Sequence, residues 1–76
     1  MPKYYFDVDG LAPDSDAVGE ELKNDHAAWE EATSYAGELL KDVDGNLMPG
    51  QEWRLVVSDV DRRELYVIHV RSQKMK

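Results

Sequence analysis

One segment of this chain, and only one, repeats its apolar residues at the spacing of an amphipathic helix. The segment runs over residues 24–41, with Asn24 or Asp25 expected to cap its first amides and Lys41 in its last turn. Gly37 inside it weakens a helix by about 1 kcal/mol relative to alanine, so a closely packed neighbour is expected there. The apolar stripe consists of Ala28, Ala32, Tyr35, Ala36, Leu39 and Leu40. The chain therefore has a single helix with which to cover a sheet.

Three other segments alternate apolar and polar residues, which is the period of a half-buried strand. They are residues 3–9, 53–58 and 64–71, and the last two are joined by a hairpin turn over 59–63. Val18–Leu22 is either a short return strand or extended chain. The order is a strand, this optional strand, the helix and two strands. It predicts an α+β fold, in which a single helix packs on one face of a small, mainly antiparallel, three- to four-stranded sheet.

The length of 76 residues indicates a single domain over residues 1–76, with 72–76 expected to form a frayed tail. The chain has no cysteine, so its core, or a second copy of itself, must supply the stability. No segment approaches the about 20 apolar residues that cross a bilayer, and the N-terminal residues lack the apolar run of a signal peptide. We therefore expect a cytoplasmic protein without a membrane partner.

Because one helix covers only one face of a sheet, the opposite face is expected to remain open. A mixed apolar and basic patch of this kind predicts a protein interface. The alternatives are that a loop or the C-terminal tail covers it, or that it is a ligand groove. The residues predicted on it are Tyr5, Arg54, Val56, Leu65, Val67 and His69. If the patch joins two copies, the substitution Val67→Asp is expected to leave a monomer.

The charges of the chain are unevenly distributed. Residues 1–52 hold thirteen Asp and Glu against three Lys, whereas residues 53–76 hold six Lys and Arg against three acidic residues. An acidic body disfavours contact with phosphate backbones, so no nucleic-acid partner is expected. The aromatic residues Tyr4, Phe6, Trp29, Trp53 and Tyr66 are needed for a core in so short a chain, and this assignment is preferred to base stacking.

The tetrapeptide DVDG occurs at residues 7–10 and 42–45, and DVD recurs at 59–61. A calcium loop of the EF-hand kind needs oxygen ligands at loop positions 1, 3 and 5 and a glutamate at 12, and neither copy complies. Asp and Gly also end helices and strands, so turn chemistry is the favoured explanation. Asp42 and Asp44 remain weak candidates for a surface cation, and neither a metal nor a cofactor is predicted.

No residue pattern indicates catalysis. The chain has no cysteine nucleophile, no G-x-S-x-G elbow and no glycine-rich phosphate loop between a strand and a helix. His26 and His69 lack the spacing of a two-histidine metal motif. Asp7 and Asp9 share one face of a strand, yet two solvated carboxylates without a pocket perform no acid-base chemistry. We therefore do not expect an enzyme.

Several segments carry a family resemblance. The opening MPKYYFDV at residues 1–8, GEEL at 19–22, the Ala-rich helix of residues 27–40 and the closing hairpin resemble a family of short bacterial proteins classed as a domain of unknown function. The resemblance covers nearly the whole chain and implies no known activity. The sequence departs from the family's pattern at Arg62, where glycine is common in the hairpin turn, and in its longer polar end at 72–76. The turn is therefore expected to be looser.

Together these features predict a small acidic protein-interaction module. It would form a homodimer or bind another protein through the uncovered sheet face or a strand edge. The first alternative is an acidic neutralising partner of a basic protein, similar to an antitoxin, and the second is a weak binder of divalent cations or small ligands.

Overall fold

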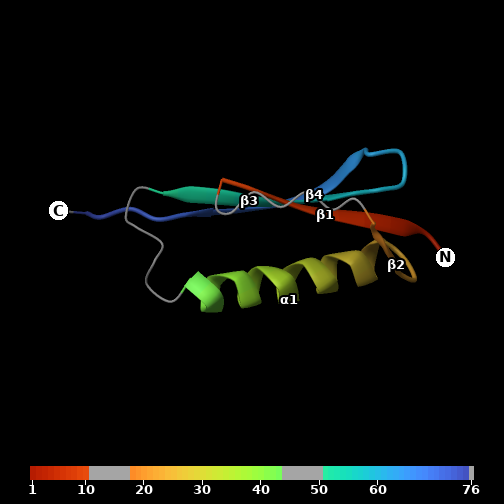
Figure 1. The fold of residues 1–76 in the computed structure, drawn as a ribbon, viewed down its shortest axis with the longest axis horizontal. Coiled ribbons are helices and arrows are strands. Elements are labelled where there is room, and N and C mark those ends of the chain that lie inside the picture. The colour runs from red at the N-terminus through yellow and green to blue at the C-terminus, as the bar shows by residue number, and fades with distance from the viewer. Residues whose placement is uncertain (11–17, 44–50, 76) are drawn as a thin grey trace.

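In the part of the chain that the structure describes, a single helix packs on one face of a four-stranded antiparallel sheet (Figure 1). The computed structural model describes residues 1–10, 18–43 and 51–75. The elements are β1 (Lys3–Asp9), β2 (Glu20–Glu21), α1 (Asp25–Val43), β3 (Glu52–Ser58) and β4 (Glu64–Arg71). The strand order is β2-β1-β3-β4, and all neighbours are antiparallel. The predicted α+β fold is confirmed. Within the described residues, no helix has the length and apolarity needed to cross a bilayer.

The strand and helix bounds follow the sequence pattern closely. β1 and β4 have the predicted bounds, β3 begins one residue early at Glu52, and α1 extends to Val43. Of Val18–Leu22, only Glu20 and Glu21 form a strand, which pairs with the first two residues of β1. The short return strand is thus present, although it borders only one end of β1.

Asn24 caps the helix. Its Oδ1 accepts a 2.9 Å hydrogen bond from the Ala27 amide, and its carbonyl accepts one of 3.1 Å from the Ala28 amide. Asp25 instead accepts a 2.7 Å hydrogen bond from the Tyr4 hydroxyl on β1. Burial of the tyrosine, together with this bond, raises the pKa of Tyr4 to about 12.

The prediction of a closely packed neighbour at Gly37 is wrong. Gly37 is exposed, and a Cβ built there would have no heavy atom within 4 Å. The helix approaches the sheet through Ala28, Ala32 and Ala36 of the predicted stripe, which are buried against the strands, and Gly37 lies outside that stripe. Their small side chains allow the helix backbone to lie close to the sheet.

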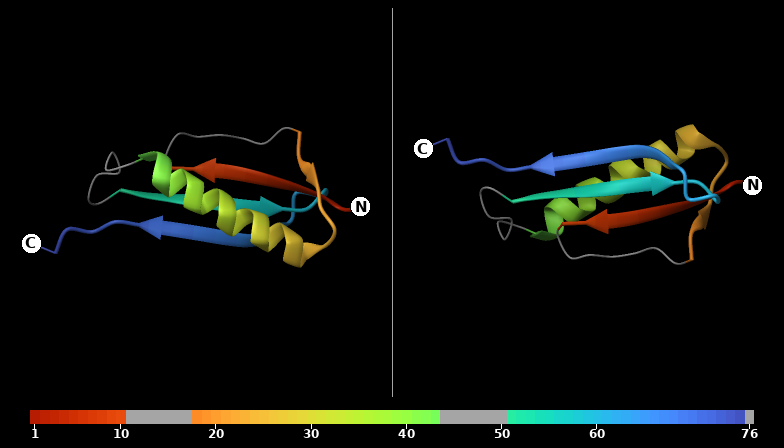
Figure 2. Two further views of the ribbon diagram at one scale, coloured as in Figure 1. Left: turned by 90° about the horizontal axis from the view of Figure 1, so that it is seen from below. Right: turned by 90° about the horizontal axis from the view of Figure 1, so that it is seen from above.

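The core consists of the side chains that β1 and β3 direct toward α1. Each of these side chains is at most 8% exposed. They are Tyr4, Phe6 and Val8 on β1, and Trp53, Leu55 and Val57 on β3. The helix crosses the sheet obliquely, from β4 near its first turn to β1 near its last (Figure 2, left). The second half of β4 therefore does not lie beneath the helix.

The turn between β3 and β4 is closed, rather than loose as expected from Arg62. Asp59 Oδ1 accepts 2.9 Å hydrogen bonds from the amides of Asp61 and Arg63. The backbone amide of Arg62 donates to the Asp59 carbonyl at 2.9 Å, and Arg62 adopts the left-handed conformation with φ of 64°. The turn thus requires the backbone geometry that glycine adopts most easily, although arginine occupies the position.

A bulge follows the turn. Val57 pairs with Tyr66 and Ser58 with Glu64, so Leu65 is an extra residue without a partner on β3. An extra residue of this kind changes the direction of its side chain relative to a regular strand. Leu65 packs against the core cluster. Its predicted place on the open face is therefore wrong.

Candidate functional site

The face of the sheet opposite α1 carries no helix or strand among the described residues (Figure 2, right). The strand register places its side chains in rows across β1, β3 and β4. One row contains Asp9, Arg54 and His69, and the next contains Asp7, Val56 and Val67. The structure thus brings together the residues that the sequence predicted on this face, apart from Leu65.

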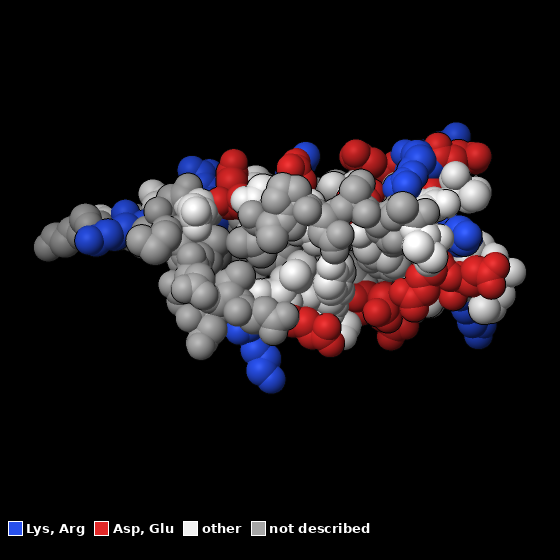
Figure 3. Space-filling model, in the orientation of Figure 1, with Lys and Arg blue, Asp and Glu red and all other residues white. Residues whose placement is uncertain are grey.

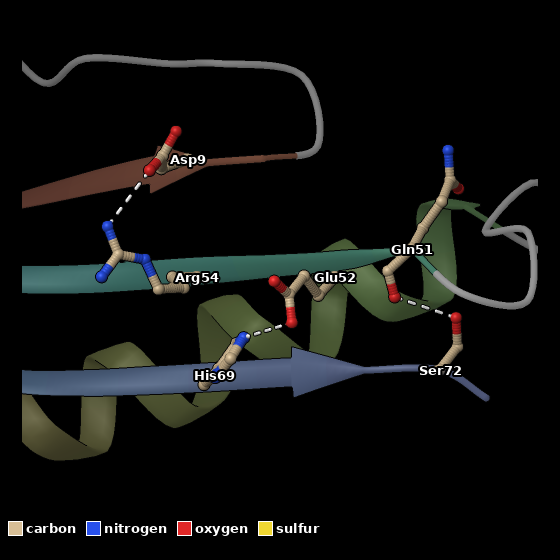
Figure 4. A network of polar contacts seen from close by, with 6 residues as sticks. All are labelled: Asp9, Gln51, Glu52, Arg54, His69 and Ser72. Carbon is tan, nitrogen blue, oxygen red and sulfur yellow. Dashed lines mark hydrogen bonds and ion pairs between the residues drawn. The ribbon is translucent and has the colours of Figure 1, made fainter.

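The polar side chains at one end of the open face contact one another in pairs (Figure 4). Arg54 Nη2 lies 3.2 Å from Asp9 Oδ2, and His69 Nε2 lies 3.1 Å from Glu52 Oε2. Beside them the Ser72 hydroxyl donates a 3.0 Å hydrogen bond to the Gln51 carbonyl. The residues come from β1, β3, β4 and the segments flanking β3 and β4, so these contacts tie the neighbouring strands together.

Arg62 extends from the turn back over the same face. Its guanidinium lies 3.7 Å from the centre of the Tyr5 ring, and its Nη1 lies 3.3 Å from Asp7 Oδ2. A cation above an aromatic ring and beside a carboxylate is attracted to both. Tyr5 is therefore partly covered by a side chain of its own molecule.

The open face is less apolar than its sequence suggested. Val56 at its centre is only 9% exposed although α1 lies on the other side of the sheet, whereas Val67 is 44% exposed. With Leu65 turned away, Val67 is the only one of the predicted aliphatic residues that remains exposed on this face. The open face therefore consists of paired polar side chains around one exposed aliphatic residue, Val67.

An open depression of about 350 Å³ lies at the end of the open face. It is lined by Asp9, Gly10, Glu52, Trp53, Arg54 and His69. Its polar side chains belong to the Arg54–Asp9 and His69–Glu52 contacts described above. The described residues include no group of three or more His, Cys, Asp or Glu placed to hold a metal ion. Asp44 lies outside the described residues, and for Asp42 only the helical backbone is described.

A second surface lies at the β4 edge of the sheet. β4 is an outermost strand of eight residues, and its only strand partner among the described residues is β3. Its residues on the helix side are Tyr66, Ile68 and Val70. They are half-buried, whereas the equivalent rows on β1 and β3 are buried. An edge of this kind presents both unpaired backbone groups and incompletely covered apolar side chains.

Trp29 of α1 borders this edge. Its ring centre lies 5.1 Å from that of Tyr66, with an angle of 49° between the ring planes, and the residue is 38% exposed. A large exposed aromatic residue beside a half-buried apolar row is a common feature of binding surfaces. The surface formed by Trp29, Tyr66, Ile68 and Val70 is called the edge surface below.

The distribution of charge differs between the two sides of the molecule. In Figure 3, acidic side chains gather on the side of α1 and β2, while acidic and basic side chains alternate along the side of the sheet. The central residues of β4, from Tyr66 to Val70, contain no Asp, Glu, Lys or Arg. The edge surface is thus an apolar region on a molecule that is otherwise highly charged.

Sequence patterns had indicated the open face and a strand edge in general, but not which strand forms that edge or which residues make up the edge surface. Period-two alternation identifies which residues of a strand share a face, yet it does not say which strand is outermost or where the helix crosses. The one residue that could have indicated the edge surface is Trp29, which lies at the border of the apolar stripe of the helix and was expected to belong to the core.

Comparison with known proteins agrees with the family resemblance. A family described as "Domain of unknown function (DUF6894)" matches residues 3–71. No curated protein and no solved structure matches the chain. The match spans all five elements, from the first residue of β1 to the last residue of β4. The chain therefore belongs to this family, the domain of unknown function DUF6894.

Proposed function

We propose that this protein is a small protein-interaction module, which accepts an extended segment of a partner as an additional strand along β4. The observation that carries the proposal is that the side chains on the helix side of the sheet differ in burial from strand to strand. The helix-side residues are buried on β1 and β3 but half-buried on β4, where the sheet ends. A further strand would cover the half-buried side chains of β4 and would pair with the free backbone edge of β4 at the same time.

The geometry of strand addition predicts what the partner segment contains. Alternate side chains of an added strand point to the same face of the sheet. Those on the helix side would contact Tyr66, Ile68, Val70 and the exposed ring of Trp29. We therefore expect a segment with apolar residues at every second position, because only such a segment covers the edge surface without burying polar groups.

The open face supports an interface less well. Asp9 and Arg54 already form an ion pair within the chain, His69 contacts Glu52, and Arg62 covers Tyr5. A partner docking there would have to break these contacts or bury them as ion pairs, and burial of an ion pair is costly. The edge surface requires no such rearrangement.

Titration with synthetic peptides tests this proposal. The probe is a peptide as long as β4 that alternates Val and Thr and carries a Lys at each end, and its control has a central Pro that removes a backbone donor. Trp29 fluorescence reports binding, because Trp29 lies beside Tyr66. The Trp29→Phe variant shows how much of the fluorescence signal comes from Trp53. Saturable binding of the first peptide alone supports the proposal, and equal responses to both peptides contradict it.

Two matched variants locate the bound peptide on one side of the edge. Val70→Lys places a charge on the half-buried helix side of β4, whereas Val67→Lys makes the same change on the open side. We expect Val70→Lys to weaken peptide binding at least about tenfold, since the ammonium group would be covered by apolar side chains. Val67→Lys is expected to change the affinity much less. The reverse order would place the peptide on the open face.

A further inference from the structure

The strand that adds to β4 can be identified from the path of the helix. We infer that it is β4 of a second copy of this chain, paired antiparallel about a two-fold axis at Ile68. This inference rests on the function proposed above and names its partner. The result would be a continuous sheet across two copies, with both helices on the same side.

A two-fold axis perpendicular to the sheet restricts the possible pairings. Residues that lie opposite each other across an antiparallel pair point to the same face. Regular pairing of β4 with β3 begins at Tyr66, because the bulge at Leu65 interrupts it before that point. The residues from Tyr66 to Arg71 therefore form the regular stretch, and its midpoint lies between Ile68 and His69. Of these two residues Ile68 points to the helix side, so an axis at Ile68 centres the apolar row of Tyr66, Ile68 and Val70.

This register matches apolar residues with apolar residues. On the helix side, Ile68 lies opposite its own counterpart and Tyr66 lies opposite Val70 of the second copy. On the open side, Val67 lies opposite His69 of the second copy. No like charges face each other within this stretch. A register centred on Val67 would instead place Val70 opposite the bulged start of the other strand, where regular pairing is lost.

The oblique helix supplies the argument for a second copy rather than a simple extended peptide. The first turns of α1 lie over the start of β4, while the end of β4 is not beneath the helix (Figure 2). In an antiparallel pair, the start of one β4 lies beside the end of the other. Trp29, which contacts Tyr66 in its own chain, would then lie next to Val70 of the second copy. Each helix thus covers the half of β4 that the other helix leaves open.

Cysteine cross-linking tests both the partner and the register, because the chain has no cysteine of its own. Ile68→Cys places two thiols opposite each other at the two-fold axis, a separation that a disulfide can bridge. Val67→Cys is the matched control on the same strand. Its two thiols would be offset by two residues. We expect Ile68→Cys to form covalent dimers at least about tenfold faster than Val67→Cys under mild oxidation.

A second pair of variants keeps the test decisive if Ile68→Cys does not fold, as judged by circular dichroism. Mixing Tyr66→Cys with Val70→Cys should give mixed dimers faster than either variant gives dimers alone, because these two positions face each other in the inferred register. Faster cross-linking by Val67→Cys would overturn this register, and equal rates at all positions would indicate random collisions and overturn the pairing.

Light scattering with size-exclusion chromatography on the unmodified chain separates this inference from the proposed function. A dimer together with cross-linking at Ile68→Cys supports both. A monomer that still binds the alternating peptide preserves the proposed function and excludes the second copy as the partner. A monomer that does not bind the peptide overturns both, and a dimer without cross-linking at β4 places the dimer interface elsewhere.

Discussion

The hydroxyl of Tyr4 donates a 2.7 Å hydrogen bond to Oδ1 of Asp25, the first residue of α1. The bond joins the start of the helix to the first strand across 21 positions of sequence. Tyr4 is 2% exposed, so its polar end requires a partner. Because Asn24 supplies the cap, the Asp25 carboxylate is available for this role. The contact helps to set the position at which α1 begins over the sheet.

Removal of this bond is expected to destabilise the fold. Tyr4→Phe keeps the buried ring and loses the hydroxyl, so the free energy of unfolding should fall by about 1.5–3 kcal/mol, the range for a hydrogen bond to a charged group. Urea denaturation provides the measurement. Tyr5→Phe removes a hydroxyl from the opposite face of β1 and should have a smaller effect. Equal losses for the two variants would show that the bond to Asp25 contributes nothing specific.

The raised pKa of Tyr4 predicts a loss of stability in alkali. Its pKa is about 12 in the folded protein against an ordinary value of 10.0, so the folded state holds the phenolic proton more tightly. The corresponding stabilisation is complete below pH 10 and declines as the pH rises through 12. Urea denaturation at pH 9 and pH 12 should therefore show a larger decrease for the unmodified chain than for Tyr4→Phe. Parallel decreases would contradict the assignment to Tyr4.

Arg62 combines an unfavourable backbone conformation with favourable side-chain contacts. Its φ of 64° costs about 1 kcal/mol or more for a residue other than glycine. Arg62→Ala keeps this cost and loses the contacts with Tyr5 and Asp7, whereas Arg62→Gly loses the contacts and removes the cost. We expect Arg62→Ala to unfold at a lower urea concentration than Arg62→Gly. Equal midpoints would indicate that the turn relaxes when the arginine is replaced.

Replacement of Gly37 by alanine is expected to stabilise the protein. Gly37 lies inside α1, and the space where a Cβ would lie is open. Gly37→Ala is therefore expected to raise the free energy of unfolding by up to about 1 kcal/mol, because alanine restricts the unfolded chain more than glycine and favours the helix. Thermal denaturation followed by circular dichroism checks the direction. A lower melting temperature would mean that Gly37 has a neighbour in solution, such as another copy of the chain.

Val67→Asp distinguishes pairing at the β4 edge from docking on the open face. Val67 points to the open side, where edge pairing places it opposite His69 of the second copy. An aspartate there is compatible with the dimer, so sedimentation equilibrium should still give a dimer. An interface on the open face predicts a monomer instead, because the charge would be introduced into the exposed apolar spot of that face.

The strands and the helix could be predicted from the sequence, because burial alternates at every second residue of a strand and at about every 3.6 residues of a helix. Residues 3–9 and 64–71 alternate in the sequence and form strands with those bounds, and Asp59 closes the turn between β3 and β4. The buried alanines of α1 likewise follow the predicted stripe. Leu65 departs from the pattern because the bulge inserts one residue into β4, and local alternation carries no signal of an insertion of this kind.

The candidate site was predicted less completely, since it depends on distances between elements. The sequence indicated an open face with Tyr5, Arg54 and His69, yet their partners Arg62, Asp9 and Glu52 follow from the strand register and from the path of one long side chain. The space beside Gly37 was likewise decided by how the helix lies on the sheet.

By itself the sequence determined that one helix and a small antiparallel sheet form, because periodic burial is a local property that hydrophobic spacing expresses directly. Only the tertiary structure decided that β4 lies at the edge and that α1 crosses the sheet obliquely. The strand order and the crossing direction arise from packing between residues distant in sequence. They leave Tyr66, Ile68 and Val70 half-buried although their spacing is the same as in the buried rows.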